Sequence, residues 1–411
     1  MSRKELLLGL AVALALRLGF SASVFDGKRL GGSNEFETLA VNLLDHGVYG
    51  YEPSVPTAQR EPGYTLFIAG LYAVSGRSPW AVILAQAVLS AATAWMICLL
   101  AVLVFDAWAG RFAFWTAVLY PYFIYYSAYS FRETLLSFLV AAVFLLVIRH
   151  GARAFGADAE RPTACLAAGG LAGWMCLTNG ALNPAVATAA AAAAFGSGRP
   201  WRWKRALVFA APVAALVGIW VVRNLVVMRS FIPASSLVGI QMYWALKVPY
   251  EALGTEEQNR ILGRPGEDTE FHRLSGLPEA RSNEAFQSAA KRLLAERPGR
   301  FLAGCAGRFF GIWRLMPRDR AYTHNTALVR VLALLSDGCI LPLALLGLYL
   351  GRSRPWVPWM AAFVFVVALT YSVSHAPIRY RVPVMPLVMV LAAGGASRVK
   401  ARLLKQDKSE S

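Results

Sequence analysis

Residues 79–105 read PWAVILAQAVLSAATAWMICLLAVLVF and contain no charged side chain. A run of this length can cross about 30 Å of hydrocarbon as one helix. Similar apolar runs recur along the whole chain of 411 residues, of which 57% are hydrophobic and only 16% charged. A soluble domain cannot cover that much apolar surface with so few polar residues. The sequence therefore predicts an all-α polytopic membrane protein.

The other membrane segments are predicted from the same pattern. The first runs from Leu6 to Val24 and resembles a signal peptide, but Arg17 interrupts it and many spans follow, so we expect a retained helix. Residues 64–76 are too short to span and indicate a half-helix at the interface. With the spans below, the chain is predicted to be a bundle of about ten transmembrane helices. Those spans are residues 79–105, 111–127, 130–149, 163–178, 181–196, 206–226, 328–350, 355–373 and 380–397.

Basic residues orient this bundle, because short cytoplasmic loops are enriched in Lys and Arg. With a cytoplasmic N-terminus, the inner side receives Arg3, Lys4, Arg111, Arg149, Arg153, Arg199, Arg202, Lys204, Arg205, Arg352, Arg354, Arg398, Lys400, Arg402 and Lys405. The two long polar segments, 25–63 and 227–327, then share the outer face, which is the periplasm in a bacterium.

Four parts of the chain are predicted on this basis. Residues 1–226 form an N-terminal transmembrane module that includes the first outer loop, 25–63. Residues 227–327 form an outer-face segment with a helix around Glu279–Glu296. Residues 328–397 form the C-terminal transmembrane helices, and residues 398–411 form a basic cytoplasmic tail.

Composition excludes several other functions. The net charge of +17 arises from 41 Lys and Arg against 24 Asp and Glu. Much of this excess lies in the short loops, so it indicates orientation rather than nucleic-acid binding. The five cysteines form no CxxC pair and lie in apolar stretches, as small buried hydrophobic residues do. The outer-face histidines show no metal-ligand spacing, so no metal site is predicted, although a divalent cation is left open.

The first outer loop contains two candidate groups. Glu35 and Glu37 lie in GGSNEFETLA at residues 31–40, where a carboxylate can act as a general base; the alternative is an ordinary solvated loop. Arg60 and Glu61 then precede Pro62-Gly63-Tyr64. An Arg fixed at this turn can hold a phosphate, or it can extend toward lipid headgroups.

Three further groups of polar residues are predicted to lie on the same face. Arg132 and Glu133 begin an apolar span, where an acid also simply complements the helix dipole. Arg223 and Asn224 follow Trp220 at the outer end of another span, a common interface anchor. The last group comprises His375, Arg379, Tyr380 and Arg381. Taken together, these groups favour an anionic, phosphate-bearing lipid as the ligand.

The same residues resemble those of the bacterial GT-C glycosyltransferases. In particular, the chain is similar to the glycosyltransferase family 39-like relatives of protein O-mannosyltransferases and of the lipid A aminoarabinose transferase. Five blocks match in order over nearly the whole chain: residues 36–47, 60–69, 121–135, 220–239 and 379–383. The second block, REPGYTLFIA, is similar to the family's Arg-x-Pro-x-Tyr-Pro-Leu-Phe-Leu-Ala. The last, RYRVP, is similar to its Arg-Tyr-Arg-x-Pro.

This resemblance implies a membrane glycosyltransferase with a GT-C bundle. The donor would be a polyprenyl-phosphate-linked sugar, and a protein, lipid or glycan acceptor would receive the sugar with inversion on the outer face. An acid in the first loop would be the base, and Glu133 a second acid. The substrate- or phosphate-binding residues would be Arg60, Glu61, Tyr64, Arg132, Arg223, Asn224, His375, Arg379, Tyr380 and Arg381.

The chain departs from the family pattern at the expected base. The family usually has Asp four residues before the aromatic residue of the first loop, and this position is Gly32. Glu35 is the expected base instead, with Asp26 as the next candidate and Glu37 nearby. Two other functions are also consistent with the sequence: a transporter or flippase for lipid-linked sugars, and a non-catalytic membrane subunit. No internal repeat supports the transporter.

Overall fold

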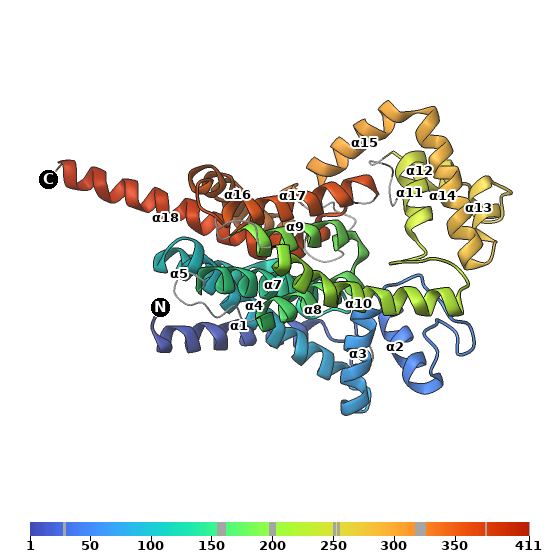
Figure 1. Cartoon of the computed structure of the whole chain (residues 1–411), viewed down its shortest axis with the longest axis horizontal. Coiled ribbons are helices and arrows are strands. Elements are labelled where there is room, and N and C mark those ends of the chain that lie inside the picture. Colours follow the sequence, from blue (N-terminus) through green and yellow to red (C-terminus); the bar gives the residue numbers. More distant parts are fainter. Residues whose placement is uncertain are drawn as a thin grey trace.

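The computed structural model describes residues 1–27, 30–153, 162–196, 203–249, 252, 255–316, 326–374 and 376–410, and every regular element in these ranges is helical. Most of the helices run along the long axis of the molecule, with both termini at one end (Figure 1). The elements are α1 (Arg3–Val24), α2 (Asn34–His46), α3 (Pro62–Ser75), α4 (Pro79–Val104), α5 (Ala107–Leu119), α6 (Pro121–Ser127), α7 (Glu133–Arg153), α8 (Pro162–Thr178), η1 (Gly180–Leu182), α9 (Asn183–Phe195), α10 (Trp203–Val227), α11 (Val238–Lys247), α12 (Glu256–Leu262), α13 (Glu270–Ser275), α14 (Glu279–Glu296), α15 (Pro298–Gly311), α16 (Thr326–Gly351), α17 (Val357–Val373), η4 (Ile378–Val384) and α18 (Met385–Glu410).

The protein is an integral membrane protein. In the described ranges, five helical segments are long and apolar enough to cross a bilayer: α1, α4, α10, Ala327–Gly351 and Ile378–Leu404. Large apolar side chains are exposed on their surfaces, including Ile219 and Val226 of α10 and Leu345 of α16. Lipid is the solvent that such surfaces require.

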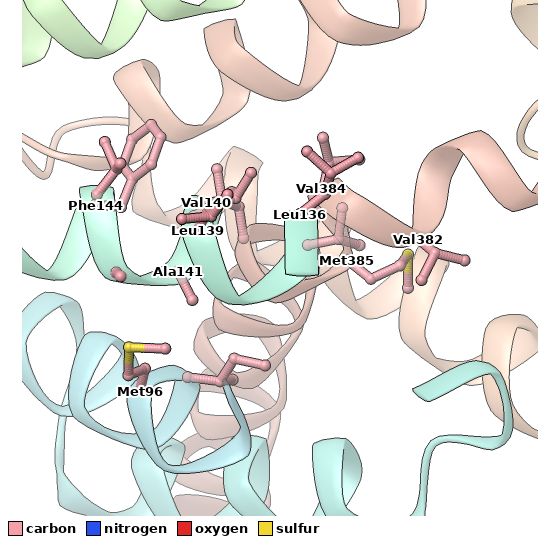
Figure 2. Close-up of a cluster of buried hydrophobic side chains, with 14 of the residues drawn as sticks. Met96, Leu136, Leu139, Val140, Ala141, Phe144, Val382, Val384 and Met385 are labelled. Atoms are coloured by element: carbon pink, nitrogen blue, oxygen red, sulfur yellow. The ribbon is translucent and has the colours of Figure 1, made fainter. Parts of the chain in front are cut away.

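The centre of the bundle is built around α7. Leu136, Val140 and Phe144 of α7 are buried together with Met96 of α4 and Met385 of α18, as Figure 2 shows. Nearby, α16 crosses α18 at very short range, because a Cβ atom on Gly347 would overlap the carbonyl oxygen of Leu391. Small residues permit such close helix contacts in membranes.

Arg17, the charge that interrupts the first predicted span, is accommodated inside the helix bundle by hydrogen bonds. Arg17 is fully buried in α1. Its guanidinium donates to Ser90 Oγ at 2.7 Å and to the carbonyl oxygens of Ala13, Val118 and Ala117 at 3.0, 3.1 and 3.3 Å. Polar partners from neighbouring helices replace water around the cation.

Several predicted elements differ from the structure in their bounds. The predicted span 111–127 is divided into α5 and α6, because Tyr120 before Pro121 is extended and proline starts a new helix. The predicted span 380–397 begins as the tight turn η4, which contains Pro383, and then continues as α18 through the predicted tail. The short helix predicted at 64–76 is confirmed as α3, which runs across the direction of the long helices (Figure 1).

The segment after α10 forms a small helical unit at the end opposite the termini (Figure 1). We call α11 to α14 the loop subdomain, and the end of the bundle next to it the loop end. The subdomain has its own core around Tyr243, Leu262, Phe286 and Ala289. The helix predicted at Glu279–Glu296 is confirmed as α14.

Candidate active site

Ionisable side chains from three separate parts of the sequence meet at the loop end. Glu61 is the residue before α3, whose helix starts at Pro62. Glu133 is the first residue of α7, a position where an acid complements the helix dipole. Arg132 precedes it, and Arg379 lies in η4. We call these four residues the charged cluster.

Glu61 and Arg132 form a largely buried ion pair. Arg132 Nη1 lies 2.9 Å from Glu61 Oε2 and also donates to the Thr178 carbonyl oxygen at 3.1 Å. The second oxygen of Glu61 accepts from the Gly180 N–H at 2.9 Å. The side chains are only 13% and 9% exposed. This pair therefore fixes the starts of α3 and α7 against the junction of α8 and η1.

Glu133 and Arg379 are incompletely paired. Glu133 Oε1 lies 3.8 Å from Arg379 Nε, and the Glu133 side chain is only 4% exposed. Glu133 Oε2 and Arg379 Nε have no hydrogen-bond partner among the described residues. Buried polar atoms are normally paired. The arrangement therefore brings one buried acceptor and one buried cationic donor close together, neither with a hydrogen-bond partner among the described residues.

Aromatic rings hold the Arg379 guanidinium in place. Its carbon lies 5.3 Å from the ring centre of Phe131 and 5.2 Å from that of Tyr380. Tyr380 stacks on Tyr371 of α17 with ring centres 4.4 Å apart, and the Tyr371 hydroxyl accepts from Asn179 Nδ2 at 2.5 Å. Sequence reasoning did not select Asn179 or Tyr371. The Asn-Gly pair after the α8 span was the available signal.

The predicted acids of the first loop lie on or near α2. Arg60 Nε donates to Glu35 Oε2 at 2.6 Å, with side chains 26% and 44% exposed. Burial and the Glu35 carboxylate raise the pKa of the adjacent Tyr51 to about 12, so this tyrosine stays protonated. Glu37 accepts from the Tyr72 hydroxyl at 2.6 Å. Asp26 is exposed just beyond α1. Glu35 is thus paired with Arg60, whereas Glu133 Oε2 has no hydrogen-bond partner in the part of the chain that the structure describes.

Gly32 lies directly against the start of the charged cluster. The Ser130 N–H donates to the Gly31 carbonyl at 2.7 Å. Gly32 has φ +103°, and a Cβ atom there would lie 3.1 Å from the Phe131 ring. This backbone conformation favours glycine.

Arg223 and Asn224 connect α10 to the first loop. Arg223 donates to the Thr57 carbonyl at 2.8 Å, to Asn224 Oδ1 at 2.9 Å and to the Tyr49 carbonyl at 3.3 Å. Asn224 Nδ2 donates to the Ile232 carbonyl at 2.8 Å. Both side chains therefore brace loop backbone in this structure.

Two of the other predicted site residues bond to partners outside the charged cluster, and one falls outside the described residues. Arg381 is fully buried and pairs with Asp337 of α16, which also accepts from the Tyr120 hydroxyl at 2.8 Å. Tyr64 is buried and donates to Gln86 Oε1 at 2.9 Å. His375 falls outside the described residues.

An apolar groove opens beside the Glu61–Arg132 pair. Its volume is about 620 Å³, and its lining carries a single charged side chain, Arg223. We call it the α3–α8–α10 groove. The lining residues are Leu43, Gly47, Val48, Tyr49, Pro56, Pro62, Leu66, Trp174, Leu177, Leu216, Ile219, Trp220, Arg223 and Val227.

Solved structures of an archaeal oligosaccharyltransferase have a similar arrangement of helices. The chain is similar to AglB from Archaeoglobus fulgidus in complex with an inhibitory peptide and a dolichol-phosphate, with TM-score 0.56 and 15% identity over 98% of this chain. The same enzyme tethered to an acceptor peptide matches with TM-score 0.56 and 16% identity over 97% of this chain. The chain spans about half of the archaeal enzyme, 51% and 49% of its length in these two structures.

The chain has a GT-C fold. The fold expected from the resemblance is thereby confirmed, at sequence identities too low for family models to detect: no family model and no curated protein matches the chain. A weaker similarity relates it to ArnT from Cupriavidus metallidurans bound to undecaprenyl phosphate, with TM-score 0.41 and 14% identity over 97% of this chain and 79% of ArnT.

Within the GT-C fold of this chain, the charged cluster lies where the helices end and the loop subdomain begins. Over the described ranges, no group of three or more His, Cys, Asp or Glu side chains could hold a metal ion. The charged cluster itself offers a buried carboxylate, Glu133, beside the arginine Arg379.

Proposed function

We propose that the protein is a membrane glycosyltransferase that moves a sugar from a polyprenyl-phosphate carrier to a protein, lipid or glycan acceptor, with inversion at the anomeric carbon. The juxtaposition of Glu133 and Arg379 carries this proposal. They lie 3.8 Å apart at the loop end of a GT-C bundle, and Glu133 Oε2 and Arg379 Nε have no hydrogen-bond partner among the described residues. A carboxylate and a cation are the groups that such a transfer requires.

The two residues would perform complementary steps. The Glu133 carboxylate would take the proton from the acceptor hydroxyl as that oxygen bonds to the anomeric carbon. The bond between this carbon and the phosphate oxygen breaks, and negative charge develops on the leaving phosphate. The Arg379 guanidinium, held by two aromatic rings, would stabilise that charge without having to reorganise.

The α3–α8–α10 groove would take part of the hydrocarbon chain of the carrier. Apolar side chains dominate its lining, and Arg223 places positive charge at it. The Glu61–Arg132 ion pair would then fix the positions of the α3 and α7 N-termini between this groove and Glu133. Glu35 and Asp26 stay alternative bases in the first loop, and a divalent cation is compatible with the free Glu133 oxygen.

By the positive-inside rule, transfer would take place outside the cytoplasm. Basic residues such as Arg3, Lys4, Arg398 and Lys400 lie toward the end that carries both termini. We therefore infer that the protein lies in the plasma membrane, which is the inner membrane of a bacterium with two membranes. Its termini would be cytoplasmic and its active site periplasmic.

Purified protein in nanodiscs tests this function. The release of polyprenyl phosphate from a panel of polyprenyl-phosphate sugars is measured by mass spectrometry, with and without EDTA. We expect Glu133→Gln to lower turnover by about 10² or more, as loss of a general base does, and Arg379→Met to have a comparable effect. Glu296→Gln, an exposed acid on α14, is the control.

Two outcomes would redirect the proposal. Full activity of Glu133→Gln, combined with loss of activity in the Glu35→Gln, Asp26→Asn double variant, would move the base to the first loop. Lipid translocation into vesicles without any sugar transfer would indicate a transporter instead.

A further inference from the structure

The stretch of first loop that precedes α3 is buried although it is irregular. We call residues 57–61 the strap; it ends in Arg60 and Glu61, which face α2 and α7 respectively. Thr57 is 3% exposed and Ala58 is fully buried. Buried backbone without regular structure must find its hydrogen-bond partners elsewhere.

Neighbouring segments supply partners for the strap carbonyl groups. Arg223 donates to the Thr57 carbonyl at 2.8 Å, and the Ser236 N–H donates to the Ala58 carbonyl at 2.9 Å. Ser235 Oγ donates to the Gln59 carbonyl at 2.6 Å. The Tyr49 hydroxyl lies 3.0 Å from the Arg60 carbonyl. Among the strap N–H groups, that of Thr57 donates to the Tyr49 carbonyl at 2.9 Å and that of Gln59 to Thr57 Oγ1 at 3.1 Å. The buried Ala58 N–H has to be paired from outside the strap.

A single carboxylate from the loop subdomain pairs that donor. Glu279, the first residue of α14, accepts from the Ala58 N–H at 2.8 Å and from Thr57 Oγ1 at 2.6 Å. It also accepts from Ser236 Oγ at 2.6 Å. Bonds to an ionised acceptor are shorter and stronger than neutral ones. Glu279 therefore joins the strap, the segment after α10 and the loop subdomain at one point.

We propose that Glu279 is a positioning residue, through which the loop subdomain fixes Arg60 and Glu61 for the reaction. This proposal rests on the proposed function. The strap is short, so a shift at Thr57 and Ala58 is transmitted to Glu61, and from there to its partner Arg132 next to Glu133. Displacements of about 1 Å can lower turnover by about 10² even when the residue that moves is far from the reacting atoms.

Hydrogen–deuterium exchange tests the contact independently of activity. In Glu279→Ala, peptides that contain Ala58 should exchange about tenfold faster or more, because the N–H loses its acceptor. Glu279→Gln keeps the shape: its amide oxygen can accept from Ala58 and Ser236, and its NH₂ can donate to Thr57 Oγ1. We expect near-normal protection there, and also in Glu296→Gln at the far end of the same helix.

The exchange of α14 itself separates a local effect from unfolding. The peptide around Phe286 and Ala289, in the core of the loop subdomain, should stay protected in Glu279→Ala. Unchanged exchange at Ala58 in Glu279→Ala would overturn the contact. Simultaneous loss of protection in α14 would overturn the positioning role in favour of a structural one.

Kinetics complete the test. Glu279→Ala should lower kcat for sugar transfer by about tenfold or more while the KM for the donor changes less, because both carboxylate oxygens bond to protein groups. Glu279→Gln should restore most of kcat. Equal kcat in Glu279→Ala and wild type would overturn the proposal. If the wild-type protein transfers no sugar, the proposed function fails. The exchange result would still show whether Glu279 bonds to the Ala58 N–H.

Discussion

Gly32 occupies the position where the resembling family has an aspartate, and its backbone conformation is one reason for the difference. Its φ of +103° strains any other residue, and a Cβ atom there would press against the Phe131 ring at 3.1 Å. In the described ranges, a buried carboxylate oxygen without a hydrogen-bond partner lies on Glu133, three residues after Ser130, whose N–H bonds to Gly31.

Gly32→Asp should accordingly destabilise the protein instead of improving it. A non-glycine residue at such a positive φ costs about 1–2 kcal/mol, and we expect lower thermal stability with no gain in transfer. Gly299→Asp is the control, since that glycine has open space and ordinary backbone in the first turn of α15. Increased transfer by Gly32→Asp would show that the first loop supplies the base.

The sequence motif around Arg381 predicts that it binds a ligand, but its buried contacts indicate that it stabilises the fold. It is fully buried with Asp337 and donates to the Ile312 and Arg314 carbonyls at 3.2 and 2.5 Å. Arg381→Met should destabilise the fold by about 3–5 kcal/mol, because it leaves a buried carboxylate uncompensated.

The double variant Arg381→Met, Asp337→Leu tests this interpretation. Removing both charges should recover much of the stability, and sugar transfer should persist. Thermal unfolding in detergent and transfer in nanodiscs are the measurements. A stable double variant with no donor binding would instead support a role for Arg381 in holding phosphate.

The members of the charged cluster were predictable one by one, but their pairings were not. Glu61, Arg132, Glu133 and Arg379 were selected because charges at the ends of apolar spans are costly. Nothing in the sequence indicated that Arg132 pairs with Glu61 and not with its neighbour Glu133. Glu279 was missed altogether, since it begins an ordinary amphipathic helix far along the chain, and its contacts depend on tertiary packing.

At the scale of the elements, glycines set the distance between α16 and α18. Gly347→Ala should destabilise this crossing by about 1–3 kcal/mol, as overpacking does, because its Cβ would overlap the Leu391 carbonyl oxygen. Gly218→Ala in α10 is the matched control, since nothing lies near that glycine; it should be neutral or stabilising by about 0.5–1 kcal/mol. Equal melting temperatures for the two variants would show that α16 and α18 do not pack closely at Gly347.

Hydropathy located the long helices but not their breaks. The span 111–127 was one apolar run in the sequence, yet Pro121 starts a separate helix, and the Tyr120 hydroxyl of the break reaches Asp337. The C-terminal end of α18 differs from the prediction because the helix is longer than the apolar run. Its charged C-terminal residues end the apolar run, but they are good helix formers, so the helix continues to Glu410.

At the scale of the whole molecule, the two termini lie together and the loop subdomain lies at the far end (Figure 1). A membrane-impermeant maleimide should therefore label Ser275→Cys in intact cells, but label Arg3→Cys only after permeabilisation, as the distribution of basic residues predicts. Cys305 and Cys339 are first changed to alanine, because neither is buried. The reverse labelling pattern would place the site in the cytoplasm.

The overall architecture could be anticipated because bilayer thickness restricts helix length and charge restricts orientation. The loop subdomain could not be anticipated in the same way. No bilayer constrains its short helices, which pack through contacts such as Tyr243 with Phe286. The count of about ten membrane crossings also stays a prediction, because several apolar helices, such as α9 and α17, are shorter than a full span.

The strap and its partner Glu279 also impose an order in time. Residues 57 and 279 are separated by 222 positions in the chain. At synthesis rates of roughly 5–20 residues per second, the ribosome needs about 10–45 s to bridge that interval. During this time Arg60 and Glu61 have already left the translation machinery, while the carboxylate that secures them does not yet exist. A nascent chain halted before α14 would lack both Glu279 and the later Arg379, so it would be inserted in the membrane yet unable to turn over a substrate.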